Sequence, residues 1–309
     1  MKILVTGGCG YIGSVLVPKL LAKEHEVVVF DTCWFGNFLA PHPRLRVFEE
    51  DFRNITWLGG YDAVIHLAAI ANDPTGDLKP DLTWDVNAAG TTRLAQIASQ
   101  SLVKQFLYAS SGSVYGICDW PKVTEDAPLV PLSEYNRTKA AAEKELLALD
   151  DGMAVQILRP ATVCGWSPRL RLDVVVNALT ALALRDGRIE LQAPEAVRPN
   201  IHIEDMTDLY LWMLARPQLT GVWNAGFENF TVRRIAQLVA ERIPATISEK
   251  PTNDPRSYRM DSSKLLAAGF KPKHKVVDAI DDLIAHHAAG TLRDEERCYN
   301  LKTMRARGL

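Results

Sequence analysis

Short runs of apolar and β-branched residues recur along the first half of the chain, and longer segments of helical periodicity separate them. The apolar runs cover residues 3–5, 26–30, 45–48, 63–67, 105–109 and 155–158. The helical patterns cover 12–22, 82–99 and 134–149. Apolar runs of this length suit the strands of a parallel sheet that helices cover on both faces. The alternation therefore predicts an α/β fold built on a doubly wound parallel sheet.

This alternation loosens after about residue 162. An Arg- and Pro-rich segment leads into a helical pattern at 174–185, and mixed strand and helix patterns continue to 273. We expect residues 1–165 to form the main sheet, with parts of the later chain returning to it. Residues 166–309 should mainly form a smaller α/β region that faces the substrate, together with a tail. The charged tail from Arg293 onward is expected to be a flexible arm or an oligomer contact.

Composition and charge exclude several classes of protein. The 309 residues are 47% hydrophobic, and 35 Lys and Arg balance 37 Asp and Glu for a net charge of −2, so no nucleic-acid partner is expected. The five cysteines are widely separated and contain no C-x-x-C pair, which predicts reduced thiols and no metal site. No apolar stretch approaches the roughly 18 residues of a membrane span. A cytoplasmic protein without a membrane contact is expected.

A glycine-rich turn follows the first apolar run. Residues Thr6 to Gly13 read as G-x-x-G-x-x-G through Gly7, Gly10 and Gly13, and as G-x-G-x-x-G if Gly8 is counted first. Glycines permit the tight turn and let the backbone approach a pyrophosphate, while the helix that follows presents free N–H groups to the anion. The motif predicts a Rossmann-type dinucleotide site.

Asp31 ends the second apolar run, near the roughly 20-residue offset at which a carboxylate binds the hydroxyls of the adenosine ribose. A carboxylate repels a 2′-phosphate, and the next residues, Thr32, Cys33 and Trp34, include no Arg or Lys to accept one. We therefore expect NAD in preference to NADP.

Tyr135 and Lys139 are four residues apart on a predicted helix, so both side chains lie on one face. An ammonium near a phenol stabilises the phenolate, and we expect Lys139 to lower the pKa of Tyr135 from ~10 toward neutrality. The helix follows a strand that ends near Ser111, whose hydroxyl can then bind the reacting oxygen. Carboxyl ends of parallel strands face the ligand crevice, so the three residues predict general acid–base chemistry there.

Together these motifs resemble the extended short-chain dehydrogenase/reductase family, and within it the NAD-dependent nucleotide-sugar epimerase/dehydratase group. The resemblance covers nearly the whole chain to about residue 273. It rests on Thr6 to Gly13, Asp31, Asp51-Phe52-Arg53, His66-Leu67-Ala68-Ala69, 86–91, 110–116, Tyr135 to Lys139, Leu158-Arg159-Pro160, 201–205 and 262–264 ahead of Gly269-Phe270.

The resemblance implies roles for individual residues. It assigns catalysis to Ser111, Tyr135 and Lys139. It assigns NAD binding to Gly7, Gly10, Tyr11, Ile12, Gly13, Asp31, Asp51, Phe52, Leu67, Ala68, Ala69, Asn87, Tyr135, Lys139, Pro160 and Val163. It assigns the nucleotide-sugar substrate to Ser111, Ser113, Thr162, Asn177, Arg198 and Arg256. It also implies a homodimer formed through the helices at 82–99 and 134–149.

Two departures narrow the reaction. The 4,6-dehydratases of this family carry an Asp-Glu pair after the catalytic Ser or Thr, whereas Gly112 and Ser113 follow Ser111 here, which disfavours dehydration. Known 4-epimerases read Tyr-Phe-Asn where this chain has Pro160-Ala161-Thr162. The segment at 161–173 resembles a branch that includes heptose-nucleotide C4 oxidoreductases.

The resemblance thus implies an epimerase that transiently oxidises C4 of a sugar nucleotide and returns the hydride to the other face. The first alternative is a net C4 dehydrogenase or ketoreductase of a nucleotide sugar, including a nucleotide heptose. The second alternative is a non-catalytic NAD-binding sensor or scaffold. Such proteins commonly lose the Tyr or the Lys, and this chain keeps both.

Overall fold

The computed structural model describes residues 1–118, 120–150, 152–250 and 257–309. Seven strands form one sheet in the order β10-β6-β5-β4-β1-β2-β3, and every neighbouring pair is parallel. The strands are β1 (Lys2–Thr6), β2 (Glu26–Asp31), β3 (Leu45–Glu49), β4 (Ala63–His66), β5 (Gln105–Ala109), β6 (Ala154–Pro160) and β10 (Gly221–Ala225). The doubly wound α/β fold predicted from the apolar runs is confirmed.

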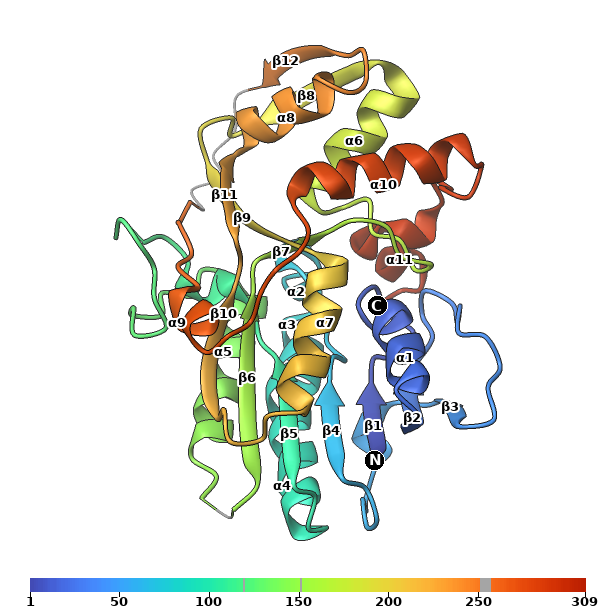
Figure 1. Cartoon of the computed structure of the whole chain (residues 1–309), viewed down its shortest axis with the longest axis vertical. Coiled ribbons are helices and arrows are strands. Elements are labelled where there is room, and N and C mark those ends of the chain that lie inside the picture. Colours follow the sequence, from blue (N-terminus) through green and yellow to red (C-terminus); the bar gives the residue numbers. More distant parts are fainter. Residues whose placement is uncertain (119, 151, 251–256) are drawn as a thin grey trace.

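Helices cover both faces of this sheet (Figure 1). Ile3 and Val5 of β1 belong to a core that includes residues of α1 (Gly13–Ala22) and α7 (Ile203–Leu214). Leu4, between them, belongs to the opposite core, with residues of α4 (Thr91–Gln100) and α5 (Glu134–Leu147). Successive side chains of a strand point to opposite faces, so a strand buried on both sides must be apolar at every position.

The helix expected at 82–99 is interrupted in the structure. It consists of α3 (Pro80–Trp84), a π-helical turn at Asp85–Gly90 and α4, and the small helix α2 (Asp73–Gly76) precedes it. The wide turn carries the buried Asn87, whose amide accepts from the Ile70 N–H at 2.8 Å and donates to the Ile70 carbonyl at 3.0 Å. The interruption therefore fastens the helix to the loop after β4.

The later chain builds a smaller region above the large sheet in Figure 1. It contains a sheet of β7 (Thr162–Cys164), β9 (Val197–His202) and β11 (Glu228–Thr231), and a parallel pair of β8 (Arg188–Gln192) and β12 (Thr246–Lys250). Its helices are α6 (Val175–Asp186), α8 (Val232–Ala240) and α10 (Val276–Ala288), which share one apolar core. Between these segments the chain returns to the main sheet as α7, β10 and α9 (Ser263–Ala267).

The charged tail differs from the arm that its composition suggested. After a short 3-10 turn at Glu296–Cys298 it forms α11 (Asn300–Ala306), which contacts α2. Cys298, Asn300, Thr303 and Met304 are buried, although charged residues surround them in the sequence. The tail folds back because one face of α11 carries only uncharged side chains, and that face packs beside the loop after β4.

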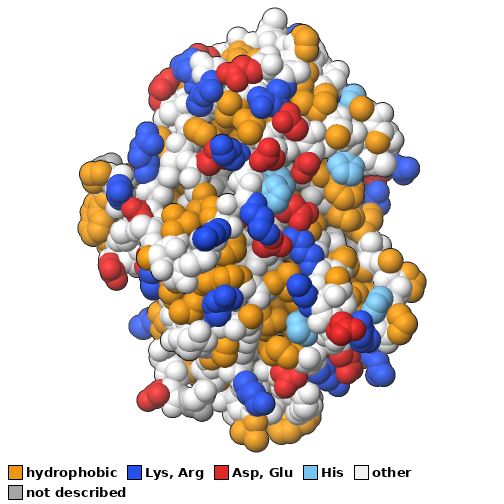
Figure 2. Space-filling view, viewed as in Figure 1, with side chains coloured by type: hydrophobic (Ala, Val, Ile, Leu, Met, Phe, Trp, Pro, Cys, Tyr) orange, Lys and Arg blue, Asp and Glu red, His pale blue; other side chains and the backbone are white. Residues whose placement is uncertain are grey.

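The surface carries mixed charge on the face shown in Figure 2, where Lys and Arg side chains are interspersed with Asp and Glu. In the described part of the chain, no helix combines the length and apolar character that crossing a membrane requires.

Candidate functional site

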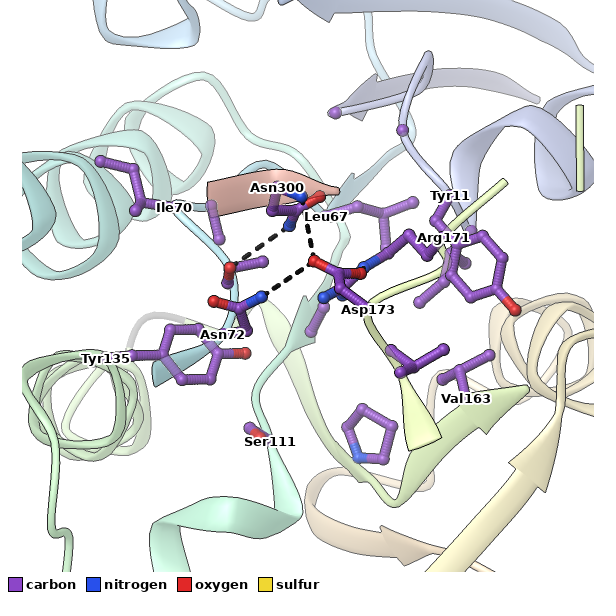
Figure 3. A pocket seen from close by; sticks show the side chains of 18 of the residues that line it. Tyr11, Leu67, Ile70, Asn72, Ser111, Tyr135, Val163, Arg171, Asp173 and Asn300 are labelled. Carbon is purple, nitrogen blue, oxygen red and sulfur yellow. Dashed lines mark hydrogen bonds and ion pairs between the residues drawn. The ribbon is translucent and has the colours of Figure 1, made fainter. Parts of the chain in front are cut away.

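A cavity of about 690 Å³ lies between the carboxyl end of the main sheet and the smaller region. Its walls come from the loops after β1, β2, β4, β5 and β6, from α6, β8 and β9, and from α11. Figure 3 shows side chains from these separate segments pointing into one space. This is where ligands bind in open parallel sheets, because the loops at the carboxyl ends of the strands diverge there.

The glycine-rich turn forms one wall of the cavity. Gly7 has a positive φ of +71°, and a Cβ at this position would lie 2.6 Å from the Ala68 backbone nitrogen. A Cβ on Gly13 would lie 2.5 Å from the Gly8 carbonyl oxygen. Only glycine fits at both positions, and the turn brings the N-terminus of α1 against the cavity. The backbone thus has the close-packed form that suits a pyrophosphate.

Asp31 lies at the cavity wall where β2 ends. One of its carboxylate oxygens accepts from the Cys9 N–H at 2.9 Å, and the other accepts from the Cys33 N–H at 2.8 Å. Burial raises the pKa of Asp31, and these two backbone hydrogen bonds act against the increase. Asp51 and Phe52 line the same end of the cavity, after β3. This end combines a carboxylate with an aromatic ring, as an adenosine moiety requires.

Ser111, Tyr135 and Lys139 line the cavity together at the carboxyl end of β5. The Ser111 hydroxyl lies 2.7 Å from the Ser113 hydroxyl and is close enough to Tyr135 to lower the pKa of its phenol. The Lys139 Nζ donates to the Ala109 carbonyl at 2.8 Å and lies 5.9 Å from the centre of the Tyr135 ring. Figure 3 shows Tyr135 and Ser111 on one side of the cavity.

Burial acts against the lowered pKa that Lys139 is expected to give Tyr135. Burial raises the pKa of Tyr135 to about 12, and the Ser111 hydrogen bond only partly opposes it. Burial also lowers the pKa of Lys139 to about 7, against a smaller opposing effect of Glu143. Both groups thus favour their neutral forms, because neither charge is well solvated at this depth.

The acidic residue that opposes this effect was missed by sequence reasoning. The E-K-E run at 143–145 is typical of a solvated helix face, but the Glu143 side chain is buried and accepts from the Arg159 Nε at 3.0 Å and from its Nη2 at 2.6 Å. Ser110 also donates to it, and Arg159 donates to the Tyr115 hydroxyl at 2.7 Å. This network joins α5 to β5 and β6 directly behind the catalytic candidates. The only sequence feature that indicated burial of Glu143 is its position four residues after Lys139, on the same face of the helix.

A second polar wall faces the Tyr135 side of the cavity. Asp173 accepts from the Arg171 Nε at 2.8 Å, from the Asn72 amide at 3.1 Å and from the Asn300 backbone N–H at 3.0 Å (Figure 3). The Arg171 guanidinium outweighs burial and holds the pKa of Asp173 below its ordinary value. The residues of this wall come from three distant parts of the sequence, and only the segment at 161–173 was noted in the sequence analysis.

Most of the residues implied by the resemblance line the cavity. They are Gly7, Gly10, Tyr11, Ile12, Gly13, Asp31, Asp51, Phe52, Leu67, Ala68, Ala69, Ser111, Ser113, Tyr135, Lys139, Pro160, Thr162, Val163 and Arg198. Arg256 lies outside the described residues.

Asn87 and Asn177, which the resemblance assigns to the ligands, do not line the cavity. Both side chains are fully buried behind the cavity wall, and their hydrogen bonds go to the chain itself. The Asn177 amide nitrogen donates to the Tyr11 hydroxyl at 3.1 Å and to the Arg171 carbonyl at 2.9 Å, while its oxygen accepts from the Gly165 N–H at 3.0 Å. These two amides hold the wall in place, because their hydrogen-bonding groups are already used.

Across the described ranges, no cluster of three or more His, Cys, Asp or Glu side chains is arranged to hold a metal ion. His66, one of the buried histidines, lies 2.5 Å from the Thr6 hydroxyl and 2.9 Å from that of Thr91. Burial lowers the pKa of His66 to about 3, so its ring is neutral.

Comparison with known proteins agrees with this geometry. The profile of the NAD dependent epimerase/dehydratase family matches residues 3–226. A UDP-glucose 4-epimerase from Lactobacillus helveticus is 30% identical over 92% of this chain and 95% of its own. The UDP-glucose 4-epimerase of Thermotoga maritima, solved with UDP-glucose, has a TM-score of 0.85 at 26% identity over 94% of this chain and 100% of its own. That of Thermus thermophilus, solved with NAD, has a TM-score of 0.82 at 27% identity and the same coverage.

Proposed function

We propose that this chain, which belongs to the NAD-dependent epimerase/dehydratase family, is a nucleotide-sugar 4-epimerase that transiently oxidises the C4 hydroxyl. One observation carries the proposal. The glycine turn with Asp31 and the group of Ser111, Tyr135 and Lys139 lie in one continuous cavity, and the smaller region forms its opposite wall. The 4-epimerases among the similar proteins support this choice of reaction.

The chain provides a site that fits NAD. Gly7 and Gly13 leave space beside the N-terminus of α1 for the pyrophosphate, and the Asp31 carboxylate is placed for the adenosine ribose. Lys139 reaches the cavity near Tyr135, where it would bind the nicotinamide ribose. When bound, NAD supplies the hydride acceptor and, in its oxidised form, a positive charge.

In the proposed reaction Tyr135 exchanges a proton with the C4 oxygen. Its neutral phenol is the form that returns a proton to this oxygen, and its phenolate is the form that removes one. Ser111 lies beside Tyr135 and steadies the same oxygen. Lys139 stabilises the phenolate when it is protonated, and its pKa of about 7 lets it exchange its own proton near neutral pH.

The substrate phosphates would bind on the side of β9. Arg198 of this strand lines the cavity with Thr162 and Ser113, and its guanidinium is held beside the Val197 carbonyl at 3.4 Å. A guanidinium offers paired donors that match phosphate oxygens. We assign Arg198 to the diphosphate of the nucleotide sugar.

The space behind Ser111 argues against loss of water. A Cβ on Gly112 would lie 2.4 Å from the Met260 methyl carbon, 2.8 Å from the Tyr258 hydroxyl and 3.1 Å from the Pro160 carbonyl oxygen. An acidic side chain at position 112, where the resemblance places one in a dehydratase, would have to displace the ends of the Met260 and Tyr258 side chains. The close packing favours chemistry that leaves the number of atoms in the sugar unchanged.

The test is to incubate the protein with UDP-, GDP-, CDP- and dTDP-linked hexoses and heptoses, and to follow product mass and stereochemistry. The proposal expects a new stereoisomer of unchanged mass, with NAD returned to its oxidised form. A change of two hydrogens would favour the net C4 dehydrogenase or ketoreductase, including a heptose enzyme. A product lighter by one water would reject both. NAD binding with no product from any sugar would favour the sensor or scaffold.

The homodimer implied by the resemblance is part of this proposal. Trp84, Leu102 and Leu147 are exposed on or beside α3, α4 and α5, the helices expected to pair. Sedimentation of the purified protein should give twice the chain mass of 34.3 kDa, and a single-chain mass would contradict the expectation.

A further inference from the structure

A buried arginine at the cavity wall has no place in the reaction described so far. Arg169 is only 4% exposed, and its Nη2 donates to the Asn300 side-chain oxygen at 2.6 Å. Its Nε and Nη1 are closed to solvent and have no partner. No ion pair involving Arg169 occurs among the residues that the structure describes. Leaving a guanidinium buried in this state costs free energy, which a bound anion can recover.

The segment that carries Arg169 is fastened to the glycine-rich turn. Ser167, two residues earlier, donates to the Tyr11 carbonyl at 2.8 Å, and the Tyr11 hydroxyl donates to the Gly165 carbonyl at 2.7 Å. These bonds cross the cavity wall between residues more than 150 positions apart in sequence. The position of Arg169 therefore depends directly on the turn that cradles phosphate.

Arg169 also contacts the end of the cavity that is placed for adenosine. Its guanidinium carbon lies 3.9 Å from the centre of the Phe35 ring, four residues beyond Asp31. The Asp31 carboxylate is close enough to affect the titration of Arg169. The guanidinium thus lies in the interval between the residues placed for adenosine and Asn300, on the lining of the cavity that a bound dinucleotide would occupy.

The C-terminal helix holds the guanidinium in this interval. Asn300 opens α11, and besides accepting from Arg169 its amide donates to the Ala71 carbonyl at 3.3 Å. Its backbone N–H donates to Asp173 at 3.0 Å. The last helix therefore orients Arg169 and connects it to the loop after β4.

We propose that Arg169, positioned by Asn300, is the cation that neutralises the pyrophosphate of bound NAD. The glycine turn offers only backbone dipoles to an anion that carries two charges, and Arg169 adds a full positive charge in a setting of low dielectric. No cation was expected near Asp31 because the residues directly after it include no Arg or Lys. Arg169 comes instead from the segment after β7.

The test compares Arg169→Met with Arg44→Met in calorimetric titrations of the NAD-free protein. Arg44 is an exposed arginine beside Glu24, outside the cavity lining. The ligands are NAD, ADP-ribose, adenosine and NADP. Arg169→Met should weaken NAD and ADP-ribose alike by about 10- to 100-fold, the usual effect of losing a charged hydrogen-bonding partner. Adenosine should bind as it does to the parent protein, the ratio of NAD to NADP affinity should be unchanged, and Arg44→Met should have no effect.

Three results would overturn the proposal. Unchanged affinity for NAD would show that the charge is not used. Equal losses for adenosine and NAD would assign Arg169 to packing against Phe35, and a loss confined to NADP would assign it to the 2′-phosphate. If Arg169→Met does not fold by circular dichroism, Asn300→Ala replaces it. That variant should weaken NAD and ADP-ribose together while sparing adenosine, and parental affinity for NAD would reject the positioning role.

Discussion

The two walls of the cavity are built in different ways. The cofactor wall is made by residues that directly follow β1, β2 and β4, so each short motif in the sequence becomes one piece of the wall. The opposite wall combines residues within 162–182 and 190–199 with Tyr258 and Asn300, which only the folded chain brings together, and it carries both Arg198 for the substrate and Arg169 for NAD. The difference shows that topology alone places the first wall, whereas packing between distant segments places the second.

The same division separates the site residues that could be predicted from the sequence from those that could not. Gly7 and Asp31 could be predicted because the carboxyl ends of parallel strands meet at one edge of a sheet. Asn300 could not, because it lies in a charged tail whose burial depends on contacts with Asp173 and Ala71. Glu143 was missed because local pattern does not show that Arg159 lies opposite on β6.

Removing the ion pair behind the catalytic residues should have the largest effect. Glu143→Gln leaves the Arg159 guanidinium buried without its carboxylate, and this should lower the free energy of unfolding by about 3–5 kcal/mol. Glu145→Gln, on the exposed face of the same helix, is the matched control. Urea denaturation measures both. Equal stability of the two variants would mean that the pair does not hold the wall in place.

Tyr135→Phe tests the point where the two walls meet. The variant keeps the ring and loses the hydroxyl, so turnover of a nucleotide sugar should fall by about 10²- to 10⁴-fold. NAD affinity should stay close to that of the parent. Tyr61→Phe, outside the cavity lining, should keep full activity. Parental turnover by Tyr135→Phe would remove the tyrosine from the mechanism.

Arg198→Ala tests whether binding of the nucleotide sugar and binding of NAD depend on different residues. Losing a charged donor to the substrate diphosphate should raise KM for the nucleotide sugar by about 10- to 100-fold. Affinity for NAD should not change, which is the opposite of the pattern expected for Arg169→Met. Arg234→Ala, on the exposed side of α8 beside Glu241, serves as the control. A parallel loss of NAD affinity would show that the walls are not separate.

The smallest effect concerns the pH dependence of stability. Burial lowers the pKa of Lys139 from 10.5 to about 7, so between these values the unfolded chain holds a proton that the folded chain does not. The free energy of unfolding should therefore gain a contribution that rises with pH across this window. Lys139→Met lacks this contribution. The free energy of unfolding of the variant minus that of the parent should therefore be highest near neutral pH and fall toward about pH 10. A constant difference across the range would contradict the buried, deprotonated lysine.

Transfer of deuterium tests the proposed reaction most directly. The substrate panel first identifies the nucleotide sugar, which is then prepared with deuterium at C4. The NAD-loaded protein converts it, and the product is analysed by mass spectrometry and NMR. Transient oxidation within one cavity predicts a C4 epimer that keeps its deuterium, with no lasting near-ultraviolet absorbance of reduced cofactor. A ketone product that has lost the label to NAD, with reduced cofactor accumulating in proportion, would contradict epimerisation and make the chain a net dehydrogenase.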